Sequence, residues 1–181
     1  FTSTAGSMTV AGIANLTSVI TGRVSDEGYI GVFGDRLTVL PVSKKESIFK
    51  ATEKADKEGQ KVGGGTENGI WLFFDKAIKQ KEHWDNIFVY SDMQAGHGGL
   101  FGVNPSEYSD YSWKRTQYID VAKLIKEYRA KVNKDVKIFL VQVAGYKDAL
   151  VPEFYDKTYI LGGWGDGLLR FAKEMSEQTK A

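Results

Sequence analysis

The sequence predicts an α/β fold: a three-layer αβα sandwich with a mostly parallel central sheet and one antiparallel edge strand. Three observations predict it. The apolar runs at 86–92 and 137–143 are continuous, which is typical of strands covered on both faces. Segments with helical periodicity alternate with strands along the chain. Two apolar stretches around Gly34-Asp35 indicate a hairpin, and therefore one antiparallel pair. Residues 1–181 are expected to form a single domain.

The elements follow in order. A helix is expected over 11–24, the hairpin strands over 29–33 and 36–40, and a short charged helix over 47–57. Pro41 is expected to end the second hairpin strand. A longer helix is expected from Thr66 to about residue 83, and a long loop over 93–119. Further helices are expected after Asp120 and Asp166, and the last strand over 158–163.

The first residues read as the end of a strand that runs into a small polar loop at 3–8. We therefore expect the first strand to be truncated, or to be supplied by an upstream segment. In this fold the first strand is central, so its loss would expose two unpaired edges. The isolated chain is expected to receive this strand from another segment or to be poorly soluble.

Composition excludes several classes. The formal net charge is +1 and the pI is near 8.0, so no global basic field indicates nucleic acid. Cysteine is absent, which excludes a disulfide framework, a thiol nucleophile and a zinc–thiolate site. The longest apolar runs fall well short of the ~20 residues of a membrane-spanning helix. We expect a cytoplasmic protein that does not associate with membranes.

Three loops are expected to converge at the carboxyl ends of the strands, where sites form in open α/β sheets. The first loop carries Ser3 and Ser7, the second is the glycine turn at 63–65 followed by Thr66, and the third carries Asp92. The glycines remove side chains from a turn before a helix N-terminus, where an oxygen-rich, anionic or metal-bound group can approach. A flexible loop with an ordinary helix cap is the alternative explanation of the glycine turn. Hydroxyl and carboxylate oxygens together indicate a magnesium site.

These loops resemble those of a von Willebrand factor A domain, and within that superfamily the C-terminal A domain of the Ro/TROVE ribonucleoproteins. The matching segments are 4–8, 64–66, 88–92 and 162–166, so the resemblance covers nearly the whole chain. It implies a module of an RNA-binding protein that handles or controls the quality of small non-coding RNA. In that family RNA binding lies largely in a separate helical-repeat domain.

The resemblance also implies a metal-ion-dependent adhesion site. Its hydroxyl ligands fall on Ser7 and Thr66 and its last carboxylate on Asp92. The family's first Asp and middle Ser are replaced here by Ser3 and Ala5. With one carboxylate left, Mg²⁺ should bind weakly or not at all, because a dehydrated hard cation needs anionic oxygen.

Other residues have two interpretations. His97, in a glycine-rich stretch, could be a base, a ligand or a contact to RNA or a partner; a lone loop histidine is more commonly just solvated. Aromatic and cationic side chains alternate at Tyr111, Trp113, Lys114 and Arg115, where they could stack on bases and meet phosphates. The alternative is that they pack the long loop onto the domain.

Three functions remain open. The first is a non-enzymatic TROVE-like A domain with a degenerate metal site, whose partner is non-coding RNA within a larger protein. The second is an A domain that binds a protein partner at the carboxyl edge of the sheet and has no RNA role. The third is a metal-dependent hydrolase, which is disfavoured because no paired carboxylates or nucleophile elbow can be identified.

Overall fold

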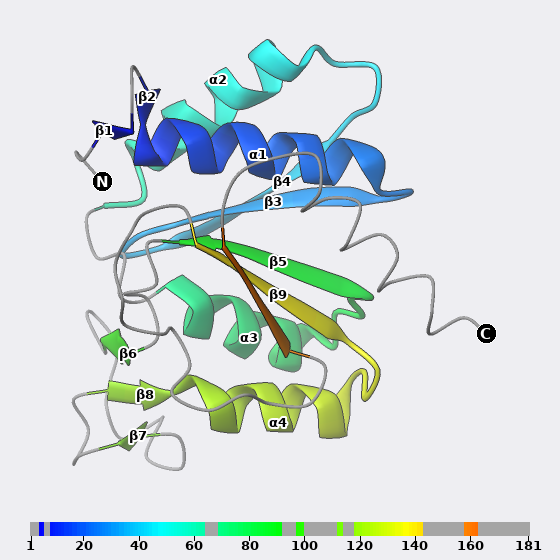
Figure 1. The fold of residues 1–181 in the computed structure, drawn as a ribbon. Coiled ribbons are helices and arrows are strands. Elements are labelled where there is room, and N and C mark those ends of the chain that lie inside the picture. Colours follow the sequence, from blue (N-terminus) through cyan, green and yellow to red (C-terminus); the bar gives the residue numbers. More distant parts are fainter. Residues whose placement is uncertain are drawn as a thin grey trace.

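The computed structural model describes residues 4–5, 8–63, 69–91, 97–99, 112–113, 118–142 and 158–162. The fold is mixed α/β, as predicted. The helices are α1 (Val10–Val24), α2 (Ile48–Gly59), α3 (Gly69–Gln80) and α4 (Val121–Lys131). The longer strands are β3 (Gly28–Phe33), β4 (Leu37–Val42), β5 (Asn86–Ser91), β9 (Lys137–Gln142) and β10 (Thr158–Gly162) (Figure 1).

The predicted parallel sheet is present as β10-β9-β5, with β9 in the centre. Each residue of β5 lies beside one of β9, from Asn86 beside Lys137 to Ser91 beside Gln142. Ile87 and Val89 of β5 are buried in one core with side chains of α3 and α4. Phe88, on the other face of β5, stacks on Phe139 with ring centroids 4.6 Å apart. The continuous apolar runs therefore do belong to strands that carry apolar contacts on both faces.

The predicted hairpin is formed by β3 and β4, which pair antiparallel from Gly28 beside Val42 to Phe33 beside Leu37. Pro41 does not end the second strand, because β4 continues to Val42 and Pro41 pairs with Tyr29. Among the described residues, the far side of β4 has no partner strand. An edge strand accommodates proline because one side of its backbone donates to no ladder.

A second core lies between the hairpin and the helices α1 and α2. Ile30 and Val32 of β3 are buried against Val19 of α1 and against Ala51 and Ala55 of α2. The alternation along β3 explains this, because every second side chain of a strand points to the same face. Figure 1 shows α1 and α2 on one side of the strands and α3 and α4 on the other.

The helix ends follow local chemistry. α2 begins after Ser47, whose side chain accepts a hydrogen bond from the backbone N–H of Lys50 at 3.2 Å, as expected of a helix N-cap. α3 ends at Gln80 and not near residue 83, because Lys81 turns left-handed with a φ of 53°. The N–H of Glu82 then bonds to the carbonyl of Ala77 at 2.9 Å, which closes the helix end.

Tyr128 of α4 ties the chain after α3 to the larger core. Its ring is fully buried, and its hydroxyl donates to the carbonyl of Glu82 and accepts from the N–H of Trp84, each at 2.9 Å. Burial is the main cause that raises the pKa of Tyr128 above its ordinary value. This contact fixes the segment that leads from α3 into β5.

The described residues differ from the prediction in two further respects. The hairpin β3-β4 and the sheet β10-β9-β5 share no hydrogen-bonded ladder, so they do not form the one continuous sheet that was predicted. The segment predicted as a loop over 93–119 contains β6 (His97–Gly99), β7 (Ser112–Trp113) and the start of β8 (Tyr118–Asp120).

In the described part of the chain, no helix combines the length and the apolar character needed to cross a membrane.

Candidate binding edge and the adjoining cavity

The carboxyl ends of the parallel strands are aligned. Ser91 lies beside Gln142, and Gln142 lies beside Gly162, so the last residues of β5, β9 and β10 form one row. Asp92 follows Ser91 directly in the sequence. Asp92 itself lies outside the described residues, and its predicted role as a ligand stays a prediction.

The beginning of the glycine turn is held against the turn of the hairpin. The N–H of Arg36 donates to the carbonyl of Val62 at 3.1 Å. Gly63 has a φ of 88°, and a Cβ on Gly34 would lie 2.2 Å from the carbonyl oxygen of Gly63. Glycine is therefore required at both positions, by the close approach at Gly34 and by the left-handed backbone at Gly63. Thr66 lies outside the described residues.

The first loop is partly described. β1 (Thr4–Ala5) pairs antiparallel with β2 (Met8–Thr9), and Ala5 lies beside Met8 directly ahead of α1. Ser3 and Ser7 lie outside the described residues. Of the five positions in the metal-site prediction, only the backbone of Ala5 is therefore placed.

His97 and Trp113 are brought into one small antiparallel sheet, β6-β8-β7, which the sequence did not predict. His97 lies beside Asp120, and Trp113 lies beside Tyr118, so the two residues are on strands that flank β8. β8 leads directly into α4. Tyr111, Lys114 and Arg115 lie outside the described residues.

No group of three or more His, Cys, Asp or Glu side chains that could hold a metal occurs in the described part. The predicted donor set consists of two hydroxyls and one carboxylate, Ser7, Thr66 and Asp92. These are hard oxygen donors that suit Mg²⁺, but their total charge is low for a tightly held ion. The chemistry of the donor set fits a weak magnesium site.

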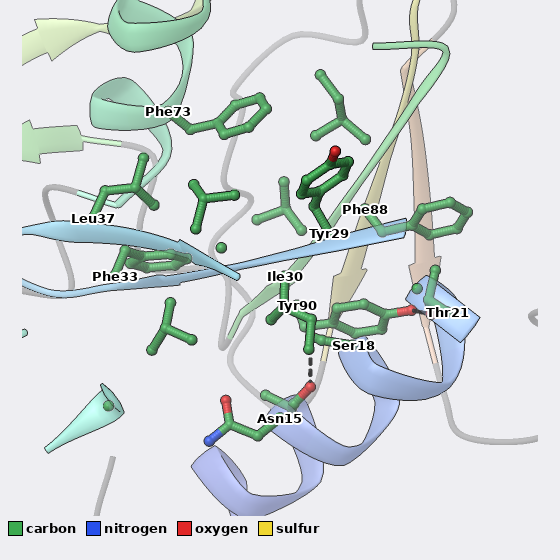
Figure 2. A pocket seen from close by; sticks show the side chains of 18 of the residues that line it. Asn15, Ser18, Thr21, Tyr29, Ile30, Phe33, Leu37, Phe73, Phe88 and Tyr90 are labelled. Atoms are coloured by element: carbon green, nitrogen blue, oxygen red, sulfur yellow. Dashed lines mark hydrogen bonds between the residues drawn. The ribbon is translucent and has the colours of Figure 1, made fainter. Parts of the chain in front are cut away.

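A cavity of about 650 Å³ lies between the hairpin and β5. Figure 2 shows Leu37 of the hairpin, Phe73 of α3 and Phe88 of β5 around this space, with Asn15 and Ser18 of α1 on another side. The lining is mostly apolar and aromatic, which is typical of sites that take up an organic group or a peptide. Two unpaired strand edges were expected from the sequence, but no local sequence pattern indicates the cavity that β3 and β5 line.

Tyr90 and Thr21 are buried residues with hydroxyl groups that line this cavity. The side chain of Tyr90 is 9% exposed, and its hydroxyl is hydrogen-bonded to the hydroxyl of Thr21 on α1. Burial raises the pKa of Tyr90 to about 12, although the hydrogen bond to Thr21 acts in the opposite direction. The phenol therefore remains neutral, and it links β5 to α1 across one end of the cavity.

Comparison with models of known families, with curated proteins and with solved structures gives no match to this chain.

Proposed function

We propose that this chain is a non-enzymatic binding module of the von Willebrand factor A type, with three layers, in a Ro/TROVE-like protein that handles small non-coding RNA. Support comes from the resemblance of its loops and from the arrangement of its parallel strands. The row Ser91, Gln142 and Gly162 marks the carboxyl edge from which such a module binds. Residues 7, 66 and 92 form its degenerate metal site, in which Ser3 and Ala5 replace stronger ligands.

Three helix N-termini lie on the same side of the fold as this edge, and they are the main support for the proposal. Figure 1 shows the starts of α1, α3 and α4 on the same side as the hairpin turn and the carboxyl ends of β5 and β9. The N-terminus of a helix carries a partial positive charge and free N–H groups, so three of them favour an anionic ligand. RNA phosphates and protein carboxylates both meet this requirement.

The residues of the small sheet at the start of α4 favour RNA over a protein carboxylate as the ligand. Trp113 lies beside Tyr118, and two cations, Lys114 and Arg115, follow Trp113 in the sequence. An aromatic ring can stack on a base while neighbouring cations meet its phosphates. His97, on β6 of the same sheet, is the further contact that we assign to RNA or to a partner.

A mobility-shift titration with a structured RNA, repeated across salt concentrations, tests this function. Replacing Lys114 and Arg115 together by alanine should weaken binding by about tenfold and reduce the salt slope by about two. The matched control replaces Lys123 and Lys126, which are exposed on α4. It removes the same charge and should leave most of the affinity.

Failure of the unaltered chain to bind RNA at any salt concentration would contradict direct RNA contact. Equal losses in both double variants would contradict the assigned contact surface. The second candidate function would then remain, which is capture of a protein carboxylate at the same edge. The position of the three helix N-termini on this side of the fold favours it, because it needs an anion but no base stacking.

A further inference from the structure

The hairpin turn presents a carboxyl group to the glycine turn. Asp35 lies between β3, which ends at Phe33, and β4, which begins at Leu37. A Cβ on Gly63 would lie 2.6 Å from the carboxyl carbon of Asp35. This space is open to the carboxyl group only because Gly63 has no side chain. The carboxyl group of Asp35 therefore packs directly against the backbone of the first glycine of the turn at 63–65.

Backbone hydrogen bonds hold the two turns in this arrangement. Within the hairpin turn, the N–H of Gly34 donates to the carbonyl of Arg36 at 2.9 Å. Arg36 also reaches the chain ahead of the glycine turn: its N–H donates to the carbonyl of Val62 at 3.1 Å, and its guanidinium donates to that of Lys61 at 3.3 Å. The residues on each side of Asp35 therefore fix its carboxyl group beside the glycine turn.

Asp35 also lies on the side of the fold where the metal site is proposed. Figure 1 shows the hairpin turn on the same side as the carboxyl ends of β5 and β9. Asp92 follows the last residue of β5 directly, and Thr66 is three residues after Gly63, a span of at most about 11 Å. The hairpin turn therefore adjoins the second of the three proposed loops and lies on the same side of the fold as the end of β5, which leads into the third.

The charge of the proposed site shows what Asp35 would add. The donors Ser7, Thr66 and Asp92 carry a single carboxylate, which is little for a dehydrated hard cation. Mg²⁺ is usually bound through one or two carboxylates, with waters at the remaining positions. A second carboxylate at this edge would restore in charge what the site lacks at Ser3.

We propose that Asp35 is a ligand of the divalent cation at this edge and supplies the carboxylate that Ser3 does not. The inference rests on the proposed function, which places a degenerate metal site here, and it adds the hairpin turn to the loops that hold the ion. The alternative is a purely structural role, in which Asp35 only holds the hairpin turn against the glycine backbone.

Titration with Mn²⁺, followed by the electron paramagnetic resonance signal of the free ion, tests the proposal. Asp35→Asn should weaken the binding of Mn²⁺ to residues 1–181 by at least about tenfold, since a charged ligand is lost. Asp26→Asn is the matched control, because Asp26 is exposed and lies near the opposite end of β3. It removes the same charge and should change the affinity by less than about twofold, because salt screens distant charges. Equal losses in the two variants, or no binding by the unaltered chain, would overturn the proposal.

Paramagnetic broadening gives a second measurement that needs no variant. In NMR spectra of the unaltered chain, Mn²⁺ should broaden the amide signals of Gly34 and Asp35 more than those of Gly28 and Tyr29, which lie at the other end of the hairpin. An excess of Mg²⁺ should restore the broadened signals, because both ions compete for the same oxygen ligands. Unchanged signals in the hairpin turn would overturn the ligand role, even if Asp35→Asn weakens binding.

Asp92→Asn separates this inference from the proposed three-loop site. Weaker binding in both Asp35→Asn and Asp92→Asn would support both assignments. Weaker binding in Asp35→Asn alone, with broadening in the hairpin turn, would support Asp35 as a ligand and contradict the three-loop site. Weaker binding in Asp92→Asn alone would overturn the role of Asp35 and leave the three-loop site in place.

Discussion

Replacing Phe74 by alanine is expected to lower the free energy of unfolding by about 3–5 kcal/mol. Phe74 is fully buried in the core that α3 and α4 form with β5 and β9. Its ring centroid lies 5.4 Å from that of Phe73 and 5.7 Å from that of Tyr128. The substitution removes these contacts and leaves a cavity that rigid neighbours cannot close.

Phe49 provides the matched control. It lies on α2, and its side chain is 85% exposed. Phe49→Ala should change the free energy of unfolding by no more than about 0.5 kcal/mol. Urea denaturation of the two variants measures both quantities. Similar small losses in both would mean that α3 does not pack on the parallel sheet as described.

Tyr90 is expected to make the free energy of unfolding fall at alkaline pH. Its pKa is raised from the ordinary value of 10.0 to about 12 by burial. The folded state therefore favours the neutral phenol, and the stability that this gives is complete below pH 10. It is lost as the pH rises from 10 towards 12, because the unfolded chain ionises first. The loss should reach about 2–3 kcal/mol.

Tyr90→Phe isolates this contribution. Phenylalanine cannot ionise, so the variant should lose less stability than the unaltered chain between pH 10 and 12. Tyr29 and Tyr128, whose pKa values are also raised, are present in both proteins and cancel in the difference. Below pH 9 the variant should be less stable by about 1 kcal/mol, since the hydrogen bond to Thr21 is lost. If the free energies of unfolding of the two proteins fall by the same amount between pH 10 and 12, Tyr90 is not a buried, neutral phenol in the folded chain.

Much of the fold could be predicted from the sequence, because its signals are local. Helix periodicity placed α1 and α2 within two residues of their observed ends, although Ser47, where the second helix was predicted to begin, is the N-cap that precedes α2. Continuous apolar runs identified β5 and β9, and the residues around Gly34 identified the hairpin. Each of these features depends on side chains close together in the chain.

Features that depend on distant contacts were not predicted. Pro41 reads as a strand end, but tertiary pairing with β3 keeps it within β4. Lys81 carries no sequence signal for a left-handed backbone, so α3 ends earlier than expected. The ladders of β6 and β7 with β8 join segments of two or three residues, which are too short to show strand periodicity.

In the candidate site, too, features that follow from local sequence could be predicted, and features that depend on distant contacts could not. The alignment of Ser91 with Gln142 follows from parallel pairing and could be anticipated from two buried strands. The contact between Gly34 and Gly63 could not, because it joins the hairpin turn to a glycine turn much further along the chain. The ligands assigned to residues 7, 66 and 92 still depend on the resemblance of the loops.

Binding of Mn²⁺ to a chain with two added ligands tests the proposed convergence of the three loops most directly. Ser3→Asp and Ala5→Ser together should increase the affinity for Mn²⁺ by at least about tenfold, since a carboxylate and a hydroxyl are added to the site. Paramagnetic broadening in NMR spectra should then be strongest near the amides of Ser91, Gln142 and Gly162, and Asp92→Asn should abolish the gain. An affinity no higher than that of the unaltered chain, or broadening centred elsewhere, would contradict the account.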